Sequence, residues 1–161
     1  MFKLEKGQKI FLVGIGGAGM TALAYFLRGA GYEVEGSDVL VSQNVEKLER
    51  DGFKVYKGHF ADNIRNSKLL IYSSAIGKDN PEISAAKAFG IKTYERGAAL
   101  KTISKEFERL TAVSGTHGKT TCATLIFHIF RTAGLLPSSL IGGDFDGSSG
   151  GAFCGGKHLV C

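Results

Sequence analysis

Short apolar runs alternate with segments of helical periodicity along the first part of the chain. Residues 9–14 form an apolar run that ends in glycine, and residues 17–30 carry apolar side chains at helical spacing before Gly31. Residues 32–36 alternate in polarity and lead into Ser37 and Asp38. The order strand, helix, strand over about thirty residues predicts a β-α-β unit.

The same alternation continues to residue 106. We expect further helices over residues 44–50, 81–89 and 98–106, and further strands over residues 53–56, 68–73 and 91–95. Asn80 followed by Pro81 is a typical helix start, because Asn caps the helix and proline fits its first turn. Strands that alternate with helices predict a Rossmann-like, doubly wound α/β domain with a parallel sheet of about five strands.

The pattern restarts near residue 108. A strand over residues 109–114 leads into a second glycine loop and a helix over residues 119–132. The glycine-rich tail from residue 140 suggests a hairpin or loop excursion before a last strand at residues 158–161. We therefore predict one domain over residues 1–107 and the phosphate-loop start of a second α/β domain over residues 108–161. Because the sequence stops inside that strand, we expect a fragment.

Composition narrows the class of protein. The net charge of +5 is spread out, and no stripe of basic and aromatic residues indicates a nucleic-acid partner. Three cysteines without a short-spaced pair (Cys122, Cys154 and Cys161) favour a reducing compartment over a disulfide framework. The amino-terminal residues are charged, and every apolar run is too short to span a bilayer. We expect a cytoplasmic protein without membrane insertion, and the sequence leaves its oligomeric state open.

The first glycine loop matches the pattern G-x-G-x-x-G between a predicted strand and a predicted helix. Gly14 permits a tight turn, Gly16 lets the backbone approach a diphosphate, and Gly19 allows close helix packing. Asp38 ends the next strand, where an acid that binds ribose is expected. Ser73 and Ser74 lie at the carboxyl end of the strand predicted at residues 68–73 and are either ligand contacts or a polar strand end. The loop predicts a nucleotide diphosphate and does not separate NAD from a UDP-sugar.

The second glycine loop spans residues 114–121 and keeps Gly118-Lys119-Thr120 at a strand-to-helix junction. It is shorter than the usual phosphate loop, because Val113 stands at the first glycine position. Its backbone amides are suited to phosphates, Lys119 to the β and γ phosphates, and the Thr120 hydroxyl to Mg²⁺. A cation at a helix N-terminus is repelled by the positive end of the helix dipole, and a bound anion offsets that repulsion.

Together the two loops resemble those of the Mur ligase family. The similarity covers most of the chain and includes residues 13–20, 36–38, 73–76, 80–83, 113–121 and 141–143. The resemblance implies an ATP-dependent amide ligase of peptidoglycan synthesis, in bacterial cytoplasm, that joins L-alanine to UDP-N-acetylmuramate through an acyl phosphate.

The resemblance also assigns residues to each ligand. The UDP-substrate would be held by Gly14, Gly16, Gly17, Gly19, Ser37, Asp38, Ser73 and Ser74. ATP would be held by Gly115, Thr116, His117, Gly118, Lys119, Thr120 and Thr121. Lys119 would neutralise the transferring phosphoryl group and Thr120 would bind Mg²⁺. No role falls to His59 or His128.

The family continues beyond this point with a further Mg²⁺ ligand, the rest of the ATP domain and an amino-acid-binding domain. We therefore expect this chain to bind the UDP-sugar without ligating. Three alternatives stay open: a murein tripeptide ligase of the same family, a NAD-binding dehydrogenase or regulatory domain, and a non-catalytic nucleotide-binding module.

Overall fold

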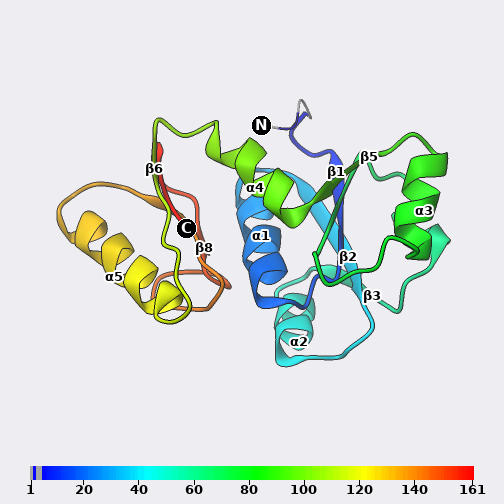
Figure 1. Cartoon of the computed structure of the whole chain (residues 1–161), viewed down its shortest axis with the longest axis horizontal. Coiled ribbons are helices and arrows are strands. Elements are labelled where there is room, and N and C mark those ends of the chain that lie inside the picture. The colour runs from blue at the N-terminus through cyan, green and yellow to red at the C-terminus, as the bar shows by residue number, and fades with distance from the viewer. Residues whose placement is uncertain (1, 3–4) are drawn as a thin grey trace.

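The structure is a computed structural model that describes residue 2 and residues 5–161, and the described residues form two β-sheets (Figure 1). The first sheet and its helices comprise β1 (Lys9–Val13), α1 (Ala18–Gly29), β2 (Glu33–Asp38), α2 (Gln43–Arg50), β3 (Lys54–Lys57), a 3-10 helix η1 (Ala61–Ile64), β4 (Leu69–Tyr72), α3 (Pro81–Ala88), β5 (Lys92–Glu95) and α4 (Arg96–Ser104). Each strand and helix that the sequence predicted in this part is present, with ends shifted by a few residues.

The five strands of the first sheet are all parallel and lie in the order β3-β2-β1-β4-β5. The chain starts in the middle with β1, builds outward to β3, and crosses back to β4. This order confirms the predicted Rossmann-like, doubly wound sheet. It also creates a crevice beside the carboxyl end of β1, where open α/β sheets bind their ligands.

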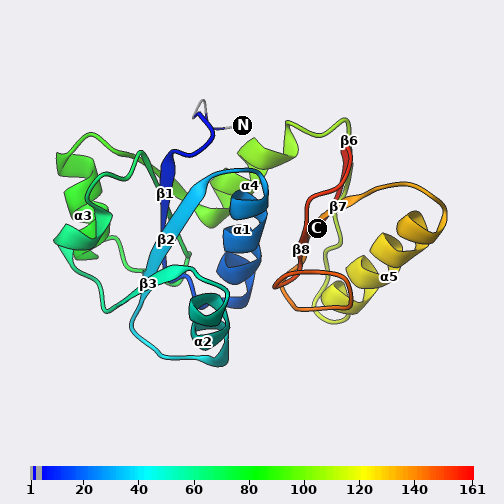
Figure 2. The same ribbon diagram turned by 180° about the vertical axis from the view of Figure 1, so that it is seen from behind.

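Helices cover both faces of this sheet (Figure 2). Alternate residues of β1 serve the two faces, because side chains along a strand point to opposite sides. Ile10 and Leu12 pack in the core shared with α1, α2 and α4, whereas Phe11 and Val13 pack with η1 and α3. All four side chains are completely buried. The central strand is therefore fixed from both sides, and so is the loop that follows it.

The second sheet comprises β6 (Arg109–Thr111), β7 (Ser138–Leu140), β8 (Ala152–Phe153) and β9 (His158–Val160), and it is accompanied by the helix α5 (Lys119–Thr132). The strand order is β6-β9-β7-β8, with only β8 antiparallel to its neighbour. The strand predicted at residues 109–114 is shorter than expected. Its partner β9 ends at Val160, and beyond it the Cys161 N–H donates to the Thr111 carbonyl and the Val113 N–H donates to the Cys161 carbonyl.

Helix α1 lies between the two sheets (Figures 1 and 2). Leu140, Ala152 and Leu159 of the second sheet share one apolar core with α1 and with α4. Both α1 and α5 begin on the lower side of the view in Figure 1, so both glycine loops lie at the same end of the molecule. No helix in the described part of the chain is long and apolar enough to cross a membrane.

Candidate functional site

The first glycine loop joins β1 to α1 at the carboxyl edge of the sheet. Gly14 has a φ of 78°, which favours glycine, and its N–H and that of Ile15 both donate to the Ser37 carbonyl at 2.8 and 3.0 Å. Gly14 and Gly16 are buried, whereas Gly17 is exposed at the start of α1. The loop is therefore built against the end of β2, and its tip faces solvent.

Asp38 fixes the middle of this loop. One carboxylate oxygen of Asp38 accepts from the Gly16 N–H at 2.9 Å, and the other accepts from the Leu40 N–H at 3.0 Å. The Asn44 amide donates to the Gly16 carbonyl at 2.9 Å. There is no room for a side chain, since a Cβ atom on Gly16 would lie 2.6 Å from a methyl group of Val45. In the free chain the Asp38 contacts are with the loop, and its predicted contact with the nucleoside stays a prediction.

Most backbone N–H groups of the first loop already donate hydrogen bonds within the chain. The Gly17 N–H donates to the Gly14 carbonyl, and the N–H of Met20 donates to the Gly17 carbonyl. Only the N–H groups of Ala18 and Gly19, in the first turn of α1, donate to no described residue. A diphosphate on this loop would therefore meet two free amides and the N-terminus of a helix, a combination that favours anions.

Ser37 supports the loop from beneath. Its side chain is completely buried, and its hydroxyl donates to the Glu82 carboxylate at 2.6 Å. His59 Nδ1 lies 2.9 Å from both the Ser37 hydroxyl and that carboxylate, and the Asn63 amide donates to the other Glu82 oxygen at 2.7 Å. The cluster occupies the Ser37 hydroxyl, so the predicted contact of this residue with the UDP-substrate stays a prediction.

Ser73 and Ser74 end β4 beside the same loop. A Cβ atom built on Gly14 would lie 3.3 Å from the Ser73 Cβ atom, which places the two residues in direct contact. Ser73 is partly buried and Ser74 is exposed. The structure thus brings all the residues predicted for the UDP-substrate to one edge of the sheet, at the ends of β1, β2 and β4.

The second glycine loop lies open to solvent between β6 and α5. All the residues predicted to bind ATP are exposed: Gly115, Thr116, His117, Gly118, Lys119, Thr120 and Thr121. The N–H groups of residues 114–118 donate no hydrogen bond to the described part of the chain. Gly118 has a φ of 75° and immediately precedes α5. The loop therefore offers unsatisfied donors at a helix N-terminus, which is a suitable anion site.

Lys119 is folded back onto its own loop. Its ammonium group donates to the carbonyls of Gly115 and Thr116 at 2.5 and 3.1 Å. These carbonyls are weak substitutes for an anion, because a lysine pairs most strongly with a charged acceptor. His117 forms no hydrogen bond with a described residue, so no described side chain is placed to exchange a proton with it.

A cleft of about 390 Å³ lies between the two loops. Gly19 and Gly142 lie together on one side of it, since the Gly19 nitrogen is 4.0 Å from a Cβ atom built on Gly142. Lys119 and Thr120 line the cleft from the second loop, and Arg96 lines it from the start of α4. The structure therefore brings Gly19 of the first loop and Lys119 and Thr120 of the second to one shared space.

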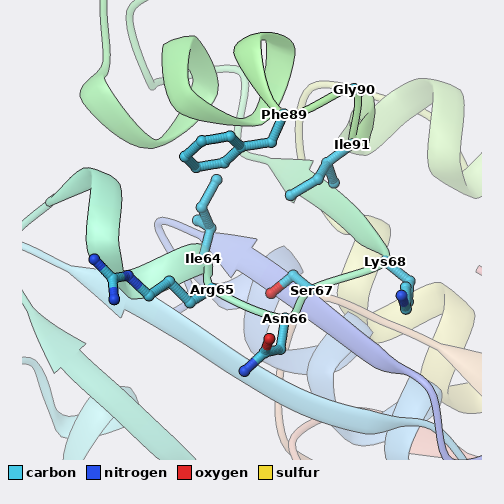
Figure 3. A pocket seen from close by; sticks show the side chains of 8 residues that line it. All are labelled: Ile64, Arg65, Asn66, Ser67, Lys68, Phe89, Gly90 and Ile91. Carbon is cyan, nitrogen blue, oxygen red and sulfur yellow. The ribbon is translucent and has the colours of Figure 1, made fainter.

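A larger hollow, of about 620 Å³, lies at the opposite edge of the first sheet, where β4 and β5 begin (Figure 3). It is lined by Ile64, Arg65, Asn66, Ser67, Lys68, Phe89, Gly90 and Ile91. Arg65 is paired with Asp62, and neither glycine loop reaches this hollow. We place the candidate site at the smaller cleft, because chemistry and not volume locates it.

The cysteines do not form a metal site. In residues 2 and 5–161, no group of three or more His, Cys, Asp or Glu side chains is arranged to hold a metal ion. His158, which lies between Cys154 and Cys161 in the sequence, has its Nε2 atom 2.8 Å from the Thr111 hydroxyl.

Three contributors to the site escaped the sequence analysis: Asn44, Glu82 and Arg96. Arg96 had a usable signal, because it directly follows a predicted strand at the carboxyl edge of the sheet. Glu82 lay in the resembling stretch at residues 80–83 but received no role, and Asn44 had no signal. Their partners lie 45 and 28 residues away along the chain.

Residues 9–108 match the family described as "Mur ligase family, catalytic domain". The UDP-N-acetylmuramate–L-alanine ligase of Caldicellulosiruptor saccharolyticus is 44% identical over 95% of the chain, and that of Acetivibrio thermocellus is 41% identical over 97%. In both cases the matched region is 34% of the relative, so the chain spans about a third of these enzymes' length.

Solved structures agree with the sequence comparison. The UDP-N-acetylmuramate-alanine ligase of Thermotoga maritima superimposes with a TM-score of 0.88 at 32% identity, over 94% of this chain and 36% of that one. The UDP-N-acetylmuramate:L-alanyl-gamma-D-glutamyl-meso-diaminopimelate ligase of Neisseria meningitides superimposes with a TM-score of 0.84 at 26% identity, over 96% of this chain and 52% of that one. By its matched residues, its sheet order and its two glycine loops, the chain belongs to the Mur ligase family.

Proposed function

We propose that this chain is the substrate-binding and phosphate-loop part of a ligase that joins L-alanine to UDP-N-acetylmuramate. The observation that carries the proposal is the cleft that Gly19 shares with Lys119 and Thr120. An anion on the first loop and a nucleotide on the second would meet there. In this proposal residues 1–107 form the domain for the UDP-substrate, residues 108–161 begin the domain for ATP, and the enzyme works in the cytoplasm.

The proposed reaction has two steps. A carboxylate oxygen of the muramoyl group attacks the γ-phosphorus of ATP, the bond to the bridging oxygen breaks, and ADP leaves with that electron pair. The amine of L-alanine then attacks the acyl carbon, phosphate leaves, and the nitrogen loses a proton. The chain contributes to the first step by holding the two reactants in one cleft, since positioning removes much of the barrier of such a reaction.

The second loop fits a nucleotide and its metal ion. The amides of residues 114–118 are free of described partners, and the Lys119 ammonium has only carbonyl acceptors. In the proposal these amides and Lys119 hold the phosphates, and the exposed Thr120 hydroxyl holds Mg²⁺. Mg²⁺ supplies neutralisation of phosphate charge when bound.

The second candidate is a murein tripeptide ligase. The support is the Neisseria meningitides structure, whose TM-score of 0.84 is close to the value for the alanine ligase. Among the superimposed structures, sequence identity favours the alanine ligase, at 32% against 26%. A NAD-binding dehydrogenase has less support, because it leaves the free amides and the lysine of the second loop without a ligand.

Calorimetric titration of the chain tests the proposal, with UDP-N-acetylmuramate, NAD and ATP–Mg²⁺ as separate ligands. We expect saturable binding of UDP-N-acetylmuramate and of ATP–Mg²⁺, and none of NAD. Binding of NAD without UDP-N-acetylmuramate would contradict the proposal and favour the dehydrogenase class. The variant Lys119→Ala is the control. It should weaken the binding of ATP–Mg²⁺ and leave the binding of UDP-N-acetylmuramate unaffected.

A further inference from the structure

Arg96 lies in the cleft between the two glycine loops, where no carboxylate of a described residue pairs with it. It opens α4 directly after β5, and its side chain is partly buried. The guanidinium group covers Gly19, since a Cβ atom built on Gly19 would lie 2.8 Å from the Arg96 Nη1 atom. Within the described residues Arg96 forms no hydrogen bond and no ion pair. An arginine stays charged at every physiological pH, so the cleft of the free chain holds an unpaired cation.

The surroundings of Arg96 add to this positive charge. Arg96 is in the first turn of α4, a turn without any acidic residue, and it covers the first turn of α1 at Gly19. The N-terminus of a helix carries partial positive charge and disfavours a cation. Lys119 lines the same cleft from the second loop. An anion in the cleft would relieve this repulsion by pairing with the guanidinium.

Three anionic groups lie at this cleft under the proposed function: the diphosphate of the UDP-sugar, its carboxylate, and the terminal phosphoryl group of ATP. The diphosphate already has the free amides of Ala18 and Gly19, which leaves the carboxylate without a partner on the first loop. Lys119 and Thr120 belong to the loop assigned to the phosphates. Arg96 lies on the other side, over the loop assigned to the UDP-sugar. Its planar fork of N–H groups matches the two oxygens of a carboxylate, which lysine does not.

We propose that Arg96 binds the carboxylate of the UDP-sugar substrate and orients it toward the phosphoryl group on the second loop. The inference rests on the proposed function, because it needs a UDP-sugar on the first loop. It gives Arg96 a positioning role: the guanidinium holds the carboxylate while one of its oxygens attacks phosphorus. It also explains why glycine at position 19 matters beyond helix packing: any side chain there would displace the Arg96 guanidinium.

Two ligands that differ only by the lactyl group that carries the carboxylate provide the test. UDP-N-acetylglucosamine is UDP-N-acetylmuramate without the lactyl group and its carboxylate. The dissociation constants of both are measured by calorimetry for the unaltered chain, for Arg96→Gln, and for the control Lys101→Gln. Lys101 is an exposed cation on the same helix α4 and does not line the cleft, so its loss makes the same change in net charge.

We expect Arg96→Gln to weaken UDP-N-acetylmuramate by about ten- to a hundredfold, the range of a charge-assisted hydrogen bond, with UDP-N-acetylglucosamine changed less than about twofold. Lys101→Gln should change neither by more than about twofold. Thermal unfolding of each variant checks that it is folded, and Gly19→Ala gives an independent variant that should lose the same preference by displacing the guanidinium.

The possible results distinguish a failure of the Arg96 inference from a failure of the proposed function. If Arg96→Gln keeps the preference for the muramate, or weakens both ligands equally, Arg96 does not bind the carboxylate and the inference is wrong while the proposed function stands. If the unaltered chain binds neither UDP-sugar, the proposed function fails and the inference fails with it.

Discussion

The two glycine loops have the same position in their folds and opposite states. The first is buried at Gly14 and Gly16, and its N–H groups are tied to Ser37, Asp38 and its own turn. The second is exposed throughout, with the amides of residues 114–118 free and Lys119 folded onto two carbonyls. The first loop is held in place by the fold before any ligand binds. The N–H groups of the second loop are exposed to solvent.

This difference predicts that the first loop contributes mainly to the stability of the fold and the second loop mainly to ligand affinity. A preformed loop loses little conformational entropy on binding, because its order is provided by the fold. Changes to the first loop and its supports should therefore lower the free energy of unfolding. Changes to the second loop should affect its ligand and leave the fold intact. The following predictions test that separation, from the largest expected change in the free energy of unfolding to the smallest.

Glu82→Ala should cause the largest loss of stability. It removes a fully buried carboxylate that accepts hydrogen bonds from Ser37 and Asn63 and contacts His59. Each buried polar group left without a partner costs about 1–3 kcal/mol, so we expect a total loss above about 3 kcal/mol. Urea unfolding measures it. Glu49→Ala, which removes an exposed carboxylate of the same size on α2, is the control, and an equal loss in both variants would contradict a special role for the cluster.

Gly16→Ala should come next, with Gly17→Ala as its matched control. A Cβ atom on Gly16 would lie 2.6 Å from Val45, while one on Gly17 would be 3.5 Å from its nearest contact. Crowding of this kind costs about 1–3 kcal/mol, against about 0.5 kcal/mol for a tolerated exposed change. Thermal and urea unfolding of the two variants check the order, and equal stabilities would show that the first loop is not tightly packed.

Asp144→Asn should have a small effect that depends on pH. Asp144 pairs with Lys47 and so links the glycine-rich tail to α2. Burial alone would raise the pKa of Asp144, but the hydrogen bond and charge of Lys47, together with hydrogen bonds from Ser148 and the Gly150 backbone, outweigh it and lower the pKa. The pair therefore stabilises the fold above the ordinary carboxyl pKa of about 4, and its contribution disappears as the pH falls through the lowered value.

Because both side chains of this pair are partly exposed, we expect Asp144→Asn to cost at most about 1 kcal/mol at pH 7. The cost should be smaller at pH 3, below the ordinary carboxyl pKa, than at pH 7. Urea unfolding at both pH values measures it, with the exposed neighbour Asp146→Asn as the control. A cost that grows on acidification would show that the sign of the linkage is wrong.

Lys119→Ala should leave stability almost unchanged. The side chain is exposed and bonds only to carbonyls of its own loop, so the change in the free energy of unfolding should stay below about 0.5 kcal/mol. The affinity for ATP–Mg²⁺ should fall at least about tenfold, because a charge-assisted contact is lost. Lys105→Ala removes an exposed lysine outside the loop and should affect neither quantity. Unfolding of Lys119→Ala at markedly lower urea would mean that the second loop is also part of the fold.

Local signals made most of the fold predictable. Helix α5 was predicted at residues 119–132 and is found there, because Gly118 and Gly134 mark its ends. The central strand was predicted from its continuous apolar run, which is typical of a strand buried on both faces. The short strands β7 and β8 gave only a hint of a hairpin, because strands of two or three residues depend on pairing partners that the local sequence does not reveal.

The candidate site was predictable where it follows local motifs and hidden where it depends on the fold. The glycines and Gly118-Lys119-Thr120 could be read directly from the sequence. His59 received no role, yet the fold buries most of it beside Glu82, 23 residues away. Arg96 and Gly19 are far apart in sequence and meet only because α4 returns to the face of the sheet that α1 covers.

Nuclear magnetic resonance of the chain labelled with ¹⁵N-glycine tests the central claim most directly, since glycine amides report on both loops at once. Titration with UDP-N-acetylmuramate should shift the resonances of Gly17 and Gly19 and leave those of Gly115 and Gly118 in place. Titration with ATP–Mg²⁺ should do the reverse. If both ligands shift the same loop, or if NAD and not the UDP-sugar shifts Gly17 and Gly19, the assignment of one ligand to each loop is wrong.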